Sequence, residues 1–220
     1  MCAQADVVFT FRTIYLEKSG KCRNFAAHKA RLRTKGINIK IHKTIMQKQS
    51  SQPRQFSDLG QQLGQILLAH GMTVSCAESL TGGTIASMIA QIAGSSAYFK
   101  GSVTSYAVSV KEEVLGVNVS EGVVSESTAR QMARGVARLL QTDCAVATTG
   151  IAGPGGAEPD KPVGTVCIAA WRKGKCEAQI FTSEHVMVSR TYHFEGDRES
   201  VILQSADAAL QLLIDILDEK

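Results

Sequence analysis

The chain has 220 residues, 44% of them apolar and 20% charged, with a formal net charge of +4 at pH 7. This length and apolar content are enough to bury the core of one globular domain. The charge is unevenly divided, because Lys and Arg outnumber acids by ten before Phe56, whereas acids are in excess by six from Phe56 onward. An acidic body disfavours a sequence-independent nucleic-acid surface, which needs clustered Lys and Arg.

The basic residues 1–54 show little helical or strand periodicity and are interpreted as a disordered leader. Three alternatives remain open for this leader: an organelle transit peptide, a nucleic-acid-binding arm, and an over-extended translation start with Met46 as the true one. Residues 55–220 are predicted to form the single folded domain.

The cysteines show no CxxC pair, and three of them, Cys76, Cys144 and Cys167, lie within apolar runs. A free thiol in such a run behaves as a small buried hydrophobe, which favours a reducing compartment over a disulfide framework. No apolar run approaches the roughly 18 residues of a membrane span, and no secretory signal pattern is present. We therefore expect a cytoplasmic protein with no membrane partner.

The periodicity of apolar residues predicts a regular order of elements from Ser57 onward. The first half contains a helix ended by Gly71, a strand over 72–76, a helix capped by Thr81 that runs to about residue 93, a strand over 97–106 and a short helix over 108–115. The second half contains a helix opened by Ser125, a buried strand over 144–149, a hairpin of 164–170 with 175–183, and a long helix capped by Asp197. Alternating helices and strands followed by an antiparallel pair predict an α/β fold, a three-layer α/β/α sandwich with a mixed sheet.

A hydroxyl and two glycines follow the first predicted strand, in the stretch Ala77-Glu78-Ser79-Leu80-Thr81-Gly82-Gly83. Helix N-termini leave N–H groups unpaired and carry partial positive charge, so they favour a developing anion near Ser79. Gly82 and Gly83 would let a substrate approach the backbone closely. The alternative is that Ser79 and Thr81 only cap the helix and that the glycines serve packing.

A phenol and an amine lie five residues apart in the next motif, Tyr106 and Lys111. A serine hydroxyl needs a base, and a lysine can serve if burial lowers its pKa. Tyr106 could then hydrogen-bond both groups and relay the proton. A solvated lysine beside Glu112 and Glu113 remains the alternative.

A glycine-rich turn, which includes Thr149, Gly150 and Gly153, follows the buried strand over 144–149. Its N–H groups could form an anion-binding concavity, although a simple tight turn is the alternative. Arg198 precedes the last helix, where it could bind a phosphate or pair with a neighbouring acid. Histidine and carboxylate spacing typical of metal sites is missing, so we expect no metal or other cofactor.

These motifs, in this order, resemble the C-terminal domain family of competence-induced CinA proteins from about Leu59 to Leu217. The shorter stretches 92–97, 122–125, 161–166 and 194–198 fit the same family. The family includes nicotinamide-nucleotide amidases, so the resemblance implies hydrolysis of nicotinamide mononucleotide to nicotinate mononucleotide and ammonia. It also implies association into a dimer or higher homo-oligomer.

The resemblance places the nucleophile at Ser79, the base at Lys111 and the supporting hydroxyl at Tyr106. Thr149 and Arg198 match positions associated with substrate binding, and the candidate binding set also includes Thr81, Gly82, Gly83, Gly150 and Gly153. The chain departs from the family at Val108, where many members have Asn, and at Ile202 and Leu203, where a second arginine is common. The rival hypothesis is a non-catalytic member that binds a nucleotide or a protein partner linked to competence or recombination.

Overall fold

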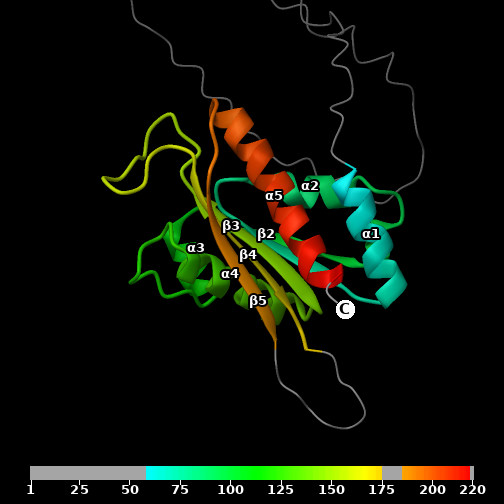
Figure 1. Cartoon of the computed structure of the whole chain (residues 1–220). Coiled ribbons are helices and arrows are strands. Elements are labelled where there is room, and N and C mark those ends of the chain that lie inside the picture. The colour runs from blue at the N-terminus through cyan, green and yellow to red at the C-terminus, as the bar shows by residue number, and fades with distance from the viewer. Residues whose placement is uncertain (1–57, 175–184, 219–220) are drawn as a thin grey trace, which may run out of the picture. The chain divides into compact units, whose positions relative to one another are not determined.

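The computed structural model describes residues 58–174 and 185–218, so the basic leader and the predicted strand over 175–183 lie outside the described residues. Five strands form one sheet in the order β2-β1-β3-β4-β5 (Figure 1). The strands are β1 (Val74–Glu78), β2 (Phe99–Thr104), β3 (Cys144–Gly150), β4 (Thr165–Arg172) and β5 (Val186–His193). β1 is parallel to β2 and β3, whereas β4 is antiparallel to β3 and β5, which confirms the predicted mixed sheet.

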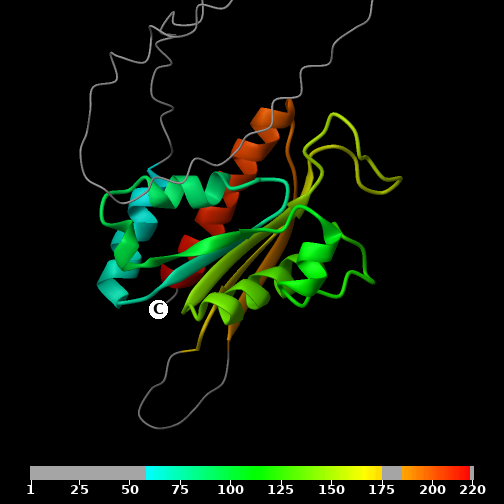
Figure 2. The same cartoon turned by 180° about the vertical axis from the view of Figure 1, so that it is seen from behind.

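Helices cover both faces of the sheet, which confirms the three-layer sandwich (Figure 2). The helices are α1 (Leu59–His70), α2 (Thr84–Ala90), the 3-10 turn η3 (Ser95–Ala97), α3 (Val108–Glu113), α4 (Glu126–Leu140) and α5 (Arg198–Asp218). One buried cluster joins α1, α2 and α5 to one face of the sheet, and a second joins α4 to the other face. α5 is long and apolar enough to cross a membrane, but 56% of its apolar stretch is buried inside the protein.

Several predicted boundaries are confirmed by the hydrogen bonds that end the helices. Gly71 ends α1 in the left-handed conformation, with φ of 61°, and its N–H bonds to the last carbonyls of the helix. The Ser125 hydroxyl accepts from Thr128 N at 3.1 Å, and Asp197 Oδ1 accepts from Ser200 N at 2.8 Å. Short polar side chains before an apolar periodic run therefore predicted these helix starts correctly.

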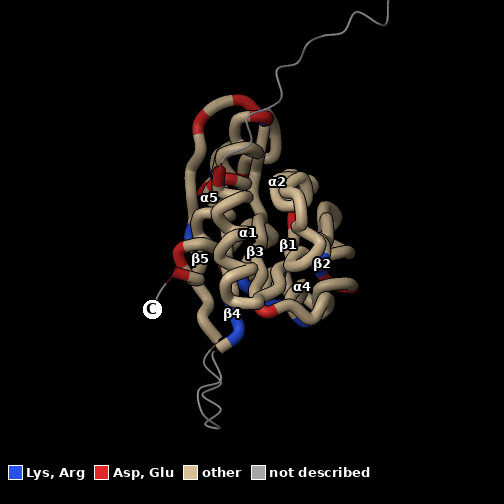
Figure 3. The backbone as a smooth tube through the Cα atoms, turned by 90° about the vertical axis from the view of Figure 1, so that its right-hand side faces the viewer, with Lys and Arg blue, Asp and Glu red and all other residues tan. Residues whose placement is uncertain are grey.

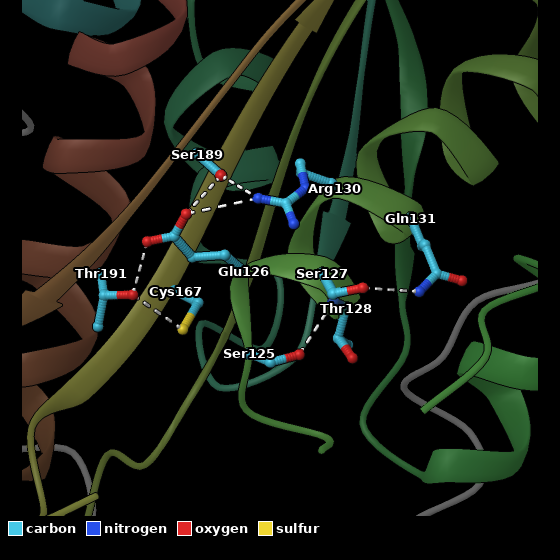
Figure 4. Close-up of polar contacts among 9 residues, drawn as sticks. All are labelled: Ser125, Glu126, Ser127, Thr128, Arg130, Gln131, Cys167, Ser189 and Thr191. Atoms are coloured by element: carbon cyan, nitrogen blue, oxygen red, sulfur yellow. Dashed lines mark hydrogen bonds and ion pairs between the residues drawn. The ribbon is translucent and has the colours of Figure 1, made fainter. Parts of the chain in front are cut away.

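The strand that pairs with β4 is β5, which begins later in the chain than the predicted partner. Its polar residues obscured the strand pattern, because they face α4 at the edge of the sheet (Figure 4). Ser189 Oγ and Thr191 Oγ1 donate to the Glu126 carboxylate at 2.6 and 2.9 Å, and Arg130 Nη1 donates to Ser189 Oγ at 2.8 Å. Hydrogen bonds from Ser189 and then Thr191 lower the pKa of the Glu126 carboxyl.

Helix α2 begins at Thr84 rather than at Thr81, so the prediction that Thr81 caps it is wrong. The Thr81 hydroxyl lies 2.9 Å from Thr148 Oγ1 and so links the turn to β3. Gly83 occupies the N-cap position with φ of 109°, a left-handed conformation that a residue with a side chain rarely adopts.

Glu78 caps α2 from the end of β1, and its side chain is fully buried. Its carboxylate accepts from Gly83 N at 3.0 Å, Ile85 N at 3.1 Å and Ala86 N at 2.9 Å, and from Ser102 Oγ at 3.2 Å. A carboxylate at this position satisfies unpaired N–H groups and complements the helix dipole. The residue before Ser79 therefore fixes the turn that carries Ser79.

Glu78→Ala is expected to lower the free energy of unfolding by about 2–4 kcal/mol, because several buried N–H groups lose their acceptor. Chemical denaturation followed by circular dichroism measures this loss. Ser102→Ala removes only the longest of the four hydrogen bonds and is expected to cost about 1 kcal/mol. Equal stability of Glu78→Ala and the parent chain would contradict the capping role.

Candidate active site

The candidate catalytic residues gather where the three parallel strands end. Ser79 directly follows β1, Ser105 directly follows β2, and the glycine-rich turn begins as β3 ends at Gly150. The carboxyl ends of parallel strands meet at one edge of a sheet, which is where open α/β folds bind ligands. A cavity of about 310 Å³ at this edge is lined by Ser79, Lys111 and the turn after β3.

The Lys111 amine lies against the Ser79 hydroxyl, although α3 and β1 are distant in the sequence. Lys111 Nζ is 2.9 Å from Ser79 Oγ and donates to Ser105 O at 2.5 Å. The lysine side chain is 1% exposed, and burial lowers its pKa. Among the described residues, none forms an ion pair with Lys111. Burial therefore shifts the protonation equilibrium of Lys111 toward the neutral amine.

The Ser105 carbonyl orients the Lys111 amine by accepting a hydrogen bond from it. A neutral amine has two hydrogens and one lone pair, and the carbonyl takes one hydrogen. In that form, the lone pair can accept the Ser79 proton at the observed 2.9 Å separation. The pair is thus arranged for a proton transfer from hydroxyl to amine, within the reach that a nucleophile and its base require.

Tyr106 lies at the rim of the cavity and not between Ser79 and Lys111. Its side chain is 62% exposed, and its hydroxyl accepts from Arg198 Nη2 at 2.9 Å. Arg198 Nη1 also donates to Gly153 O at 2.6 Å. This arrangement differs from the expected proton relay through Tyr106, because the Tyr106 hydroxyl is bonded to Arg198 at the rim of the cavity.

The end of β3 and the turn after it supply much of the cavity wall, with Thr149 and Gly150 from the strand and Gly153 from the turn. Thr149 Oγ1 donates to Val123 O at 2.8 Å, which fixes the opposite wall. A Cβ on Gly150 would lie 2.7 Å from Thr165 O, so only glycine allows this approach of β3 to β4. The predicted binding residues of this turn therefore lie in the cavity.

Thr81, Gly82 and Gly83 do not line this cavity. Gly82 N donates to Ser79 O at 3.2 Å, and Gly83 N donates to the Glu78 carboxylate. Of the two candidate anion-binding stretches, 82–83 and 149–155, the first therefore has both glycine N–H groups engaged in hydrogen bonds of the turn itself.

Leu80 is a site residue that the sequence analysis missed. It lines the cavity directly after Ser79, and within the described chain its N–H donates to no other group. Its position directly after Ser79 could have identified it from the sequence. At a strand-to-helix turn, the backbone N–H of the residue that follows a nucleophile can point at the reacting carbonyl. The described histidines, His70, His185 and His193, lie outside this cavity, and residues 58–174 and 185–218 hold no metal-ligand cluster.

A family model described as the CinA C-terminal domain matches residues 56–217. This chain belongs to the CinA C-terminal domain family. The match covers nearly the whole described body and all the candidate site residues, so the resemblance inferred from the motifs is confirmed.

Relatives of two lengths are similar to this chain. The nicotinamide-nucleotide amidohydrolase PncC of Enterobacter agglomerans is 41% identical over 162 residues, covering 72% of this chain and 93% of that protein. PncC of Escherichia coli (strain K12) is 40% identical over 159 residues, which are 70% of this chain and 90% of that protein. A CinA-like protein of Geobacter metallireducens is 44% identical over 147 residues, which are 65% of this chain but 33% of that protein. The chain thus matches about a third of the longer relatives.

Solved structures share the fold. The crystal structure of competence/damage inducible protein CihA from Agrobacterium tumefaciens superposes with a TM-score of 0.66 at 33% identity, covering 76% of this chain and 98% of that one. A CinA superfamily protein from Klebsiella pneumoniae gives a TM-score of 0.66 at 29% identity, covering 74% and 98%. The sandwich is therefore the fold of the family.

Because Lys111 is buried, we expect the free energy of unfolding to depend on pH in the alkaline range. Between the lowered pKa of the folded lysine and its ordinary value near 10.4, the unfolded chain binds a proton that the folded chain does not. The free energy of unfolding should therefore rise with pH in this window, by at most about 1.4 kcal/mol per pH unit. Urea denaturation at several alkaline pH values measures the slope.

Lys111→Met provides the control, because it removes the titrating amine and should flatten this part of the stability profile. An identical slope in Lys111→Met and the parent chain would show that other groups cause the pH dependence.

Proposed function

We propose that this protein hydrolyses the carboxamide of nicotinamide mononucleotide to nicotinate mononucleotide and ammonia. The observation that carries the proposal is the buried Lys111 amine 2.9 Å from the Ser79 hydroxyl. The two PncC relatives, matched over 90% and more of their length and named nicotinamide-nucleotide amidohydrolases, support the same substrate. The reaction needs water and no redox cofactor.

Ser79 is the nucleophile and Lys111 its base. The neutral amine takes the Ser79 proton as Oγ attacks the amide carbon, and the resulting ammonium gives that proton to the leaving nitrogen, which departs as ammonia. The acid part of the substrate stays bound to Oγ as an ester. Lys111 then takes a proton from water as the water attacks, and returns it to Ser79 Oγ when the ester breaks.

The negative charge that develops on the substrate oxygen needs donors inside the cavity. The Leu80 N–H lies next to the nucleophile, and the turn that follows β3 supplies further backbone. One such donor is typically worth about 3–4 kcal/mol of the activation barrier. These groups replace Gly82 and Gly83, whose N–H groups stabilise the turn itself.

Arg198 is the proposed ligand of the substrate phosphate. It lines the cavity at the rim, and its guanidinium now donates to two neutral oxygens, Gly153 O and Tyr106 Oη. A phosphate would be a stronger acceptor for the same donors, because charge-assisted hydrogen bonds are roughly twice as strong as neutral ones. Tyr106 accordingly has a supporting role beside Arg198.

Ser79→Ala is expected to reduce the rate of ammonia release from nicotinamide mononucleotide by about a thousandfold or more, because the nucleophile is lost. Lys111→Met should be similarly inactive, and the double variant little worse than either, because nucleophile and base act as a unit. A coupled ammonia assay on purified protein measures these rates.

Ser96→Ala is the matched control, since this exposed serine lies outside the cavity and its variant should keep the parent rate. Full activity of folded Ser79→Ala would refute the mechanism. An inactive parent chain that still binds the nucleotide would instead favour the non-catalytic hypothesis.

Arg198→Gln is expected to raise KM for nicotinamide mononucleotide about tenfold or more, because a charge-assisted bond to the phosphate is lost. The corresponding nucleoside, which has no phosphate, should be hydrolysed by the parent and Arg198→Gln with similar kcat/KM. Steady-state kinetics on the two substrates measure the difference. An equal loss on both would show that Arg198 does not act through the phosphate.

A further inference from the structure

The proposed reaction asks the Lys111 amine to become a buried cation. When it takes the Ser79 proton it is an ammonium group, which has three hydrogens and no lone pair. Two groups of the described chain lie within hydrogen-bond distance of Nζ, the Ser105 carbonyl at 2.5 Å and Ser79 Oγ at 2.9 Å. Once Ser79 Oγ has become an ester oxygen, the carbonyl is the one strong acceptor of the two. The charged amine therefore needs a further acceptor, because a buried charge with unpaired hydrogens is costly.

Four buried side-chain atoms of the described chain have no hydrogen-bond partner: Tyr98 Oη, Ser105 Oγ, Trp171 Nε1 and Arg172 Nε. Such atoms are rare in native proteins. Trp171 lines a second cavity, of about 390 Å³, at the end of the sheet opposite the catalytic one, but its Nε1 is itself inaccessible. Ser105 is the residue of the four that is hydrogen-bonded to Lys111. Its hydroxyl is therefore the unpartnered group nearest to the catalytic chemistry.

The strand register places Ser105 beside Ser79. β1 and β2 are parallel neighbours that lie next to α2 (Figure 3), and Glu78 pairs with Thr104 at their carboxyl ends. Ser79 and Ser105 directly follow the two strands, and Ser105 N donates to Glu78 O at 2.8 Å. The Ser105 side chain is fully buried. Its backbone is thus held on both sides, by Glu78 at the N–H and by Lys111 at the carbonyl.

The Ser105 hydroxyl can change position while this backbone stays fixed. Rotation about the Cα–Cβ bond takes Oγ through three staggered positions. The carbonyl of the same residue lies 2.5 Å from Lys111 Nζ, so the rotation moves Oγ in the immediate surroundings of the amine. A hydroxyl oxygen offers two lone pairs, and those of Ser105 are unused. Apart from Ser79, the hydroxyls of the cavity wall, those of Thr149 and Tyr106, each already have a hydrogen-bond partner.

We propose that Ser105 Oγ turns toward Lys111 Nζ and accepts a hydrogen bond from the ammonium group formed during the reaction. Ser105 is then a positioning residue, because it acts through the base and does not line the cavity that takes the substrate. The proton of Ser79 moves to Nζ as before, and Ser105 Oγ gains one hydrogen bond without exchanging a proton. The inference rests on the proposed amidase function. It assigns to Ser105 the hydroxyl contact with the amine that the sequence predicts for Tyr106.

Ser105→Ala removes this acceptor and is expected to lower kcat for nicotinamide mononucleotide about tenfold, because a hydrogen bond to a charged group is lost. KM should stay within about twofold, since the substrate does not touch Ser105. Ser105→Thr keeps a hydroxyl and should restore most of kcat. Ser205→Ala is the matched control and should keep the parent kcat, because this equally buried serine donates to Val201 O within α5. Steady-state ammonia release measures these constants.

The pH profile of kcat separates this role from a merely structural one. An acceptor for the ammonium raises the pKa of the amine, so its removal should move the acid limb about one pH unit toward lower pH, which corresponds to a tenfold change. Ser205→Ala should leave the limb in place. The ionisable groups on the segments around the amine are the same in all variants: Glu78, Tyr106, Glu112, Glu113, Glu158 and Arg198.

Stability provides a readout that needs no substrate. The free energy of unfolding rises with pH above the pKa of the folded lysine, so in urea denaturation this rise should begin at a lower pH in Ser105→Ala than in the parent chain. A shifted rise in a protein that releases no ammonia would support the contact between Ser105 and the amine and refute the amidase function. An unshifted rise together with an unshifted acid limb would overturn the proposal, whatever the change in kcat.

Discussion

The burial of one amine is the constraint on which the candidate site depends. An ammonium group is costly to place away from water unless a carboxylate compensates it, and among the described residues Lys111 has no such partner. The Ser105 carbonyl accepts one of its hydrogens and leaves Ser79 as the other close neighbour. Burial therefore lowers the pKa of this lysine, whose amine lies against the Ser79 hydroxyl.

The position of Ser79 depends in turn on the buried carboxylate beside it. The Glu78 carboxylate accepts hydrogen bonds from the backbone N–H groups at the start of α2, so the positive end of that helix stabilises this carboxylate. The N-terminus of α2 next to Ser79 is therefore engaged in holding the turn in place. Leu80 and the turn after β3 line the cavity, whereas Gly82 and Gly83 do not.

The sheet also separates two cavities of different character. The one at the carboxyl ends of the parallel strands combines the Ser79 hydroxyl, a buried amine and a rim arginine. The one at the opposite end combines solvent-accessible cations with a buried indole N–H that has no partner. β3 contributes Thr149 and Gly150 to the first cavity, and β4 contributes Trp171 to the second.

The sequence by itself determined the layered fold, most element positions and the family, because apolar periodicity and capping residues act over a few neighbouring positions. It also singled out Ser79, Lys111 and Arg198, whose residue types are informative without coordinates. Only the tertiary structure decided which of these groups meet. Three contacts depend on how β1, β2 and α5 pack: Lys111 with Ser79, Tyr106 with Arg198, and the Glu78 carboxylate with the N–H groups of α2. The local sequence pattern does not encode these distances, because the residues in contact come from different elements.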